Sequence, residues 1–116
     1  MATGRFGAYD LSANTPQSLA QGQTDRYTAC AVSLCNRGKS PVKVSIAITT
    51  TVNSISDLDY LDKDVELFPN CVLERTGIAI KSSQYITVSS DTASVSAVAW
   101  GVESGDTISV SAIPTA

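Results

Sequence analysis

The chain has 116 residues, of which 43% are hydrophobic and 16% are charged, and its formal net charge is −3. This length fits a single domain, residues 1–116, with a core of its own. The acidic balance and scattered basic residues exclude a nucleic-acid surface, which needs a basic stripe to displace counterions from phosphates. No stretch approaches the ~18 apolar residues of a membrane helix, and residues 1–10 lack the apolar region of a signal peptide.

The N-terminal part, residues 1–13, is expected to form a first strand or an arm, which Gly4 and Gly7 leave loosely specified. A short run at residues 17–21 follows it. Gly22 then turns the chain toward its most regular segment.

Residues 27–50 contain two β-rich runs separated by the turn-forming letters NRGKSP. Apolar side chains alternate with smaller or polar ones at Cys30, Val32, Leu34, Val42, Val44, Ile46 and Ile48. A period of two gives each run one apolar face, so we predict a central hairpin. Aspartate at Val44 or Ile46 is expected to abolish folding, and aspartate at Lys43 or Ser45 to cost much less if that face is solvated.

Residues 51–57 lack clean alternation and are expected to form a loop. The segment DYLDKDVELF alternates from Tyr60 to Leu67, which favours a strand over a short helix. The letters FPN then predict a turn, because proline cannot donate to a ladder and asparagine tolerates turn conformations. In the strand expected at residues 71–80, the isolated Gly77 indicates a bulge or a close backbone approach.

Further strands are expected at residues 85–89 and 94–102. Both faces of the second one are fairly apolar, which is typical of an interior strand. A last, half-exposed strand is expected at residues 107–112, within a C-terminal extension at about 104–116. Seven or eight short strands and no helical period predict an all-β fold, an antiparallel β-sandwich or, less commonly at this length, a closed barrel.

The sequence offers little for catalysis. It has no histidine, its cysteines lack CxxC spacing, and its glycines form no phosphate-binding pattern. We therefore predict that the protein is not an enzyme and needs no cofactor. The acidic residues Asp57, Asp59, Asp62 and Asp64 are able in principle to bind calcium, but without the EF-hand order we favour a solvated loop entering an edge strand, and no metal site.

Three cysteines cannot all pair within one chain. Cys30 and Cys35 are expected on opposite faces of one strand, roughly 17 Å apart, which excludes a bond between them. Cys71 is able to meet either one. The interpretation that we favour is three thiols, buried as small hydrophobes, in a protein made in a reducing cytosol.

Trp100 has two interpretations. With Tyr85 or Tyr27 it would stack on a sugar ring, as aromatic faces do in carbohydrate-binding sandwiches. We favour the other interpretation, a core side chain, because a lone tryptophan in an alternating strand usually packs inside.

Two segments, SLCNRGKSPVKVSIAI at residues 33–48 and FPNCVLERTGIAI at residues 68–80, resemble short stretches of small virion structural proteins of tailed phages, notably phages of cyanobacteria. With GRFGAYDLSANT and SVSAVAWGVE, the resemblance extends to about Glu103. It implies a β-sandwich subunit in the virion, made in the host cytoplasm and attached in multiple copies to capsid, neck, tail or fibre as a decoration or accessory protein. The alternative is a receptor- or glycan-binding module on the particle surface.

We expect the partners to be other virion proteins and copies of the chain itself. Contacts are expected at residues 1–13, at residues 104–116 and at the tip of the central hairpin. The candidate interface residues are Arg5, Phe6, Arg37, Lys39, Ile108 and Val110. Deletion of residues 1–7 or 104–116 is expected to weaken incorporation into particles more than it lowers the melting temperature.

Overall fold

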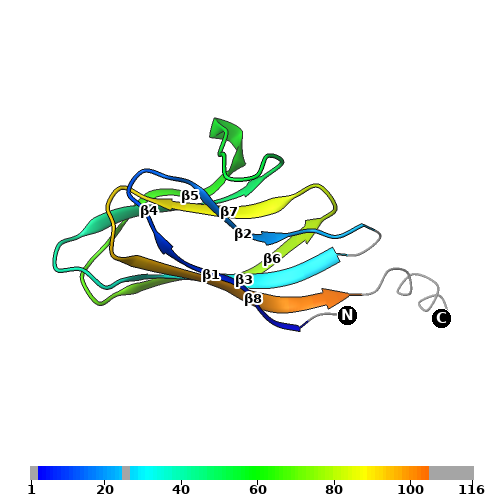
Figure 1. The fold of residues 1–116 in the computed structure, drawn as a ribbon, viewed down its shortest axis with the longest axis horizontal. Coiled ribbons are helices and arrows are strands. Elements are labelled where there is room, and N and C mark those ends of the chain that lie inside the picture. The colour runs from blue at the N-terminus through cyan, green and yellow to red at the C-terminus, as the bar shows by residue number, and fades with distance from the viewer. Residues whose placement is uncertain (1–2, 25–26, 105–116) are drawn as a thin grey trace.

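The computed structural model describes residues 3–24 and 27–104 (Figure 1). They form eight β-strands and one short 3₁₀ helix. In chain order the elements are Thr3–Leu11 (β1), Gln17–Gln21 (β2), Tyr27–Asn36 (β3), Val42–Thr49 (β4), Asp57–Asp59 (η1), Tyr60–Leu67 (β5), Val72–Lys81 (β6), Tyr85–Ser90 (β7) and Val95–Ser104 (β8). No helix within these two ranges is long and apolar enough to cross a lipid bilayer.

The strands form two antiparallel four-stranded sheets that pack face to face (Figure 1). Sheet A has the order β1-β8-β3-β6, and sheet B has the order β2-β7-β4-β5. The chain is one long hairpin with its tip between β4 and β5, rolled so that β3 pairs with β6, β2 with β7 and β1 with β8. This is the strand order of a jelly roll. The predicted antiparallel β-sandwich is confirmed.

The predicted central hairpin is wrong, although both of its strands exist. β3 lies in sheet A between β8 and β6, whereas β4 lies in sheet B between β7 and β5. Residues 37–41 therefore form a corner that crosses the ~10 Å between stacked sheets and not the ~4.8 Å between paired strands. Both strands still turn their apolar faces toward one core, so the alternation fits either arrangement and does not identify the neighbouring strand.

Asn36, the last residue of β3, is fully buried at this corner and uses its whole side-chain amide. Its Nδ2 donates to the carbonyl oxygens of Ser40 at 2.9 Å and Leu67 at 3.0 Å, and its Oδ1 accepts from the backbone amide of Gly38 at 2.9 Å. The contacts with Ser40 and Gly38 hold the corner in shape. The contact with Leu67 ties β3 to the end of β5 in the other sheet.

A second corner, residues 68–71, is fastened to the same residue. The backbone amide of Asn36 donates to the carbonyl of Cys71 at 3.1 Å, and the amide of Asn70 donates to the carbonyl of Asn36 at 2.8 Å. Asn70 has a φ of 64°, in the left-handed region that asparagine tolerates, so the turn predicted from FPN is confirmed. Asn36 thus organises two of the four crossings between the sheets at this end of the molecule, from β3 to β4 and from β5 to β6.

Aliphatic side chains fill the space between the sheets. The fully buried ones include Val32, Leu34, Val44, Ile46, Ile86, Val88 and Val95. A Cβ at Gly7 would lie 2.3 Å from the carbonyl oxygen of Leu19, so only glycine lets β1 pass this close to β2. Gly77 has a φ of +72°, and the register of β6 against β3 shifts there, which confirms the predicted bulge.

The N-terminal segment, for which the sequence allowed a strand or an arm, is a strand of the sandwich. β1 pairs with β8 from Thr3 to Leu11 with one irregularity near Phe6. Deletion of residues 1–7 would therefore remove half of a strand, and its expected small effect on melting no longer follows. The strand predicted at residues 107–112 lies outside the described residues.

Part of the outer face of sheet B, around Ser18, Thr49 and Thr87, lies beneath the chain's own β4–β5 connection, residues 50–59 (Figure 1). Beneath this connection the hydroxyls of Thr49 and Thr87 lie 2.9 Å apart, and that of Ser18 lies 2.8 Å from Thr87. The connection is fastened by Asn53, whose Oδ1 accepts from the amide of Ser18 at 2.8 Å. Outward-facing hydroxyls of sheet B therefore bond to one another in a buried row.

Ser45 lies on the same outer face and corrects the expected solvation of this side of β4. It is 4% exposed, and its Oγ accepts a hydrogen bond from the amide of Asp64 at 2.9 Å. Asp64 has a φ of 51° at an irregularity of β5, which places its backbone over Ser45. Lys43 is exposed as expected, and Val44 is buried as expected.

Replacing Asn36 with alanine is expected to lower the free energy of unfolding by about 3 kcal/mol, because the carbonyls of Ser40 and Leu67 and the amide of Gly38 lose their side-chain partner. Lys39→Ala, at an exposed position of the same corner, is the matched control and should change this free energy by less than about 0.5 kcal/mol. Urea unfolding of the two variants measures both effects. Equal losses would show that the Asn36 amide does not hold the corners.

Candidate functional site

The outer face of sheet A, which we call the open face, carries uncharged side chains along its two central strands. The buried residues of β8 and β3 alternate with outward ones, so the outward set follows from the register of the strands. These outward residues are Ser96, Val98, Trp100 and Val102 on β8 and Ala29, Ala31, Ser33 and Cys35 on β3. No described part of the chain is hydrogen-bonded across them as residues 50–59 are across sheet B.

Charged residues of the open face lie on its two edge strands. Arg5 and Asp10 of β1 stand directly across from Trp100 and Ser96, and Glu74 of β6 stands across from Ser33. An uncharged centre within a charged rim is the usual anatomy of a protein–protein interface.

Trp100 corrects the expectation of a core side chain. It is half-buried and shares the open face with Val98 and Val102, of which Val102 is 45% exposed. The core is filled from the other side of β8, where Val95, Ala97 and Ala99 are fully buried. The sequence showed that both faces of this strand are fairly apolar. It did not show whether an apolar face is buried in the core of the same chain or against a partner.

The structure separates the predicted interface residues into two groups. Arg5 lies on the open face, and Phe6 is half-buried against the core at the end of the sandwich where β3 begins. Arg37 and Lys39 lie in the corner after β3; because Arg5 is in register with Ala31 through Trp100, six residues of strand, about 20 Å, separate Arg5 from Arg37. The remaining two, Ile108 and Val110, lie outside the described residues.

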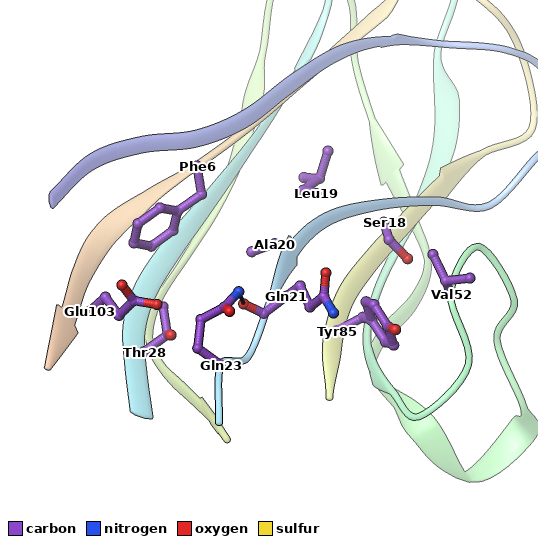
Figure 2. A pocket seen from close by; sticks show the side chains of 10 residues that line it. All are labelled: Phe6, Ser18, Leu19, Ala20, Gln21, Gln23, Thr28, Val52, Tyr85 and Glu103. Carbon is purple, nitrogen blue, oxygen red and sulfur yellow. Dashed lines mark hydrogen bonds between the residues drawn. The ribbon is translucent and has the colours of Figure 1, made fainter. Parts of the chain in front are cut away.

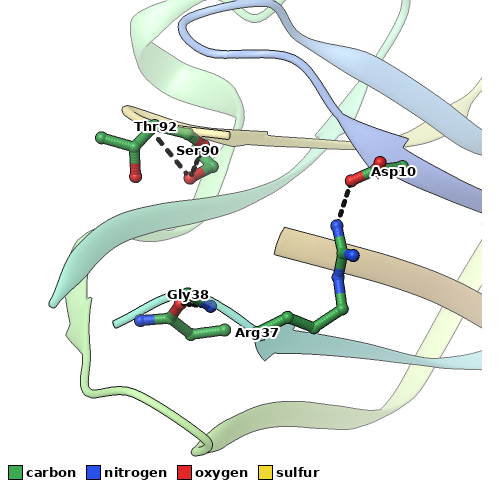
Figure 3. Close-up of polar contacts among 6 residues, drawn as sticks. Asp10, Arg37, Gly38, Ser90 and Thr92 are labelled. Atoms are coloured by element: carbon green, nitrogen blue, oxygen red, sulfur yellow. Dashed lines mark hydrogen bonds and ion pairs between the residues drawn. The ribbon is translucent and has the colours of Figure 1, made fainter. Parts of the chain in front are cut away.

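Arg37 has a partner within the fold. Its guanidinium donates to Oδ1 of Asp10, which joins the first corner to the end of strand β1 (Figure 3). Both side chains are largely exposed, so this ion pair contributes little to stability. It nevertheless gives Arg37 a structural role within the fold, in addition to its expected role in contacts with a partner protein.

Two acidic residues of the β4–β5 region have separate partners. Asp59 accepts from the amide of Ser56 at 3.1 Å, and Asp62 accepts from Arg75 Nε and Nη2 at 3.0 and 3.2 Å. The second contact is bidentate and joins the edge strands β5 and β6 of the two sheets. Among the described residues, no three histidine, cysteine or acidic side chains gather in a group that would hold a metal ion.

A cavity of about 520 Å³ lies at the end of the sandwich where β3 begins, and we call it the end cavity (Figure 2). Its lining includes Phe6, Gln21, Gln23, Thr28, Tyr85 and Glu103. These side chains come from β1, β2, β3, β7, β8 and the segment after β2. Sequence reasoning singled out Phe6 and Tyr85 and missed the others, because only the pairing of distant strands brings them together.

The alternative interpretation of Trp100, a sugar platform with Tyr85, is not assembled. Trp100 lies on the outer side of sheet A, whereas Tyr85 belongs to sheet B and lines the end cavity. Two aromatic rings on different sheets do not present one stacking surface.

The three cysteines are free thiols in three environments. Cys30 faces the core, and burial raises the pKa of its thiol to about 11, because the thiolate is disfavoured away from water. Cys35 is half-buried on the open face, opposite in direction to Cys30 as predicted, and Cys71 is exposed in the second corner. The expected burial is confirmed for Cys30 and is wrong for Cys71.

Comparison with known proteins assigns no family. No protein-family model, no curated protein and no solved structure matches the chain. Its surfaces and cavities therefore carry the functional argument.

Alkylation of the folded protein at pH 8 is expected to modify Cys71 first, Cys35 more slowly and Cys30 only after unfolding, because reactivity follows thiolate fraction and access. Peptide mass spectrometry with iodoacetamide, in buffer and in denaturant without reductant, measures the order. Rapid native modification of Cys30 would contradict its burial. Fewer than three modified sites in denaturant would reveal a disulfide.

Proposed function

We propose that the protein is a non-enzymatic structural subunit of a virus particle, of the tailed-phage type, that assembles in multiple copies through its open face. The observation that carries this proposal is the absence of charge from the outward side chains of β8 and β3, while the edge strands β1 and β6 are charged. Water-exposed sheet faces of a monomer normally alternate with polar residues. An apolar sheet face therefore favours contact with another protein.

The segments that carry the phage resemblance meet in space. Residues 33–48 and 68–80 contain the two corners, and they are joined by the backbone hydrogen bonds of Asn36 with Asn70 and Cys71. They act as parts of the framework and not as a chemical site. The jelly-roll order supports the proposal by analogy, since viral capsid domains and lectins use it, but such an analogy alone does not assign a function.

The occupant of the open face that we propose is a second copy of the chain. A two-fold axis parallel to the strands would place β1 of one copy over β6 of the other, which brings Arg5 and Glu74 to the same rim with opposite charges. Four strands at about 4.8 Å spacing and ten residues at about 3.3 Å give about 600 Å² of sheet. This is comparable to the roughly 800 Å² per partner of a standard interface.

Val98→Glu and Val102→Glu are expected to reduce self-association at least tenfold, because each would bury an unpaired carboxylate at the centre of the contact. Leu58→Glu is the matched control, since Leu58 is 90% exposed and lies in the connection that covers sheet B. Sedimentation velocity over a concentration series measures association. A wild-type protein that stays monomeric throughout, or equal weakening by Leu58→Glu, would contradict the proposed interface.

Assignment to a particle predicts that the protein sediments with virus particles in lysates of the cells that produce it. Quantitative mass spectrometry of gradient fractions should find many copies per particle, and fewer copies of Val98→Glu than of Leu58→Glu. Recovery only at the top of the gradient would contradict a structural role in the particle.

A further inference from the structure

The end cavity has features of a binding site that the proposed assembly does not use. It lies at the end of the sandwich away from the Asn36 corners and extends around the free edge of β2, with Phe6 and Thr28 on the core side and Ser18 and Tyr85 on the outer side of sheet B (Figure 2). Its volume of about 520 Å³ falls within the range of small-molecule sites. Phe6 and Leu19 give it an apolar wall, while Gln21, Gln23 and Thr28 supply polar groups.

Thr28 provides an independent sign of a ligand. This residue is 3% exposed, and its Oγ1 makes no hydrogen bond to any described residue. Buried hydroxyls are normally paired, because an unpaired one loses its contacts with water and gains nothing in return. Figure 2 shows the Thr28 hydroxyl on the cavity side of β3, between Glu103 and Gln23. A valine of the same shape would fill the position without this loss.

The polar groups around the cavity select a class of ligand. The side-chain amides of Gln21 and Gln23 and the hydroxyls of Thr28, Ser18 and Tyr85 are neutral, and most of them both donate and accept. Glu103 adds one carboxylate, which only accepts and disfavours an anionic ligand. Among the described lining residues there is no lysine or arginine to hold a phosphate or carboxylate group. Such a lining fits neutral hydroxyl groups, each of which also donates and accepts.

Phe6 gives the core side of the cavity an aromatic wall, whereas Tyr85 lies on the other side of β2, at the opposite end of the cavity in Figure 2. The C–H faces of a sugar ring pack well on aromatic rings, while its hydroxyls bond to amides and hydroxyls around the edge. We propose that the end cavity binds a neutral sugar residue, with Thr28 Oγ1 as one of its hydrogen-bond partners.

Nuclear magnetic resonance of the full chain tests the proposal with glucose, galactose and N-acetylglucosamine as probes. At least one of them is expected to shift the backbone amide signals of Gln21, Gln23 and Thr28 in a saturable way, and to leave those of Val98 and Val102 unchanged. Absence of any saturable shift with all three sugars, or shifts confined to the open face, would overturn the proposal.

Thr28→Val provides the sharper test. Without ligand it is expected to raise the melting temperature, because it removes an unpaired buried hydroxyl, and to weaken binding of the active sugar roughly tenfold. Thr49→Val is the matched control: its hydroxyl bonds to Thr87 and to the carbonyl of Thr51, so this change should lower the melting temperature and leave binding intact. Unchanged sugar affinity in Thr28→Val would overturn the role of this hydroxyl, and a lowered melting temperature would show that it has a structural partner.

Discussion

The hydrogen bonds of Asn36 are the constraint on which the arrangement of the strands depends. With its amide bonded to Ser40, Gly38 and Leu67, and its backbone to Asn70 and Cys71, this residue fixes two of the corners where the chain passes between sheets, β3 to β4 and β5 to β6. A buried amide is tolerated only when its donors and acceptors are paired, so the position admits few other side chains. Once β3 and β6 leave these corners side by side, the pairs β2–β7 and β1–β8 follow as the two halves of the hairpin roll up.

This topology gives the two sheets different outer faces. The hairpin tip, residues 50–59, folds over sheet B, and the outward hydroxyls there become buried and paired. Sheet A contains the first and last described strands, with β8 between β1 and β3. Within the described residues, no segment covers its uncharged central strands in a comparable way. We infer that a second copy of the chain covers the outer face of sheet A, as residues 50–59 cover part of the outer face of sheet B.

Strand positions were predictable from the sequence, because alternation of period two depends only on which residues face an apolar layer. The strands from β3 to β8 were expected within a few residues, β1 as a strand or an arm and β2 only as a short run, and Gly77 marked its bulge. Strand partners were not predictable, since β3 and β4 bury the same faces whether they form a hairpin or a corner. For the same reason Trp100 was wrongly expected in the core, because alternation does not distinguish an apolar face that packs on the core from one that packs on a partner. Gln21 and Thr28 carry no local signal at all, and only the rolled topology brings them to one cavity.

Trp100 is the single tryptophan of the chain and lies in the middle of the open face. Its fluorescence therefore reports directly on the surface by which we propose that copies assemble. The most direct test is acrylamide quenching of this fluorescence over a dilution series, with the extent of association measured in the same samples. The account predicts that quenching weakens and the emission shifts to the blue as association proceeds. Quenching that stays constant while the protein associates would contradict it.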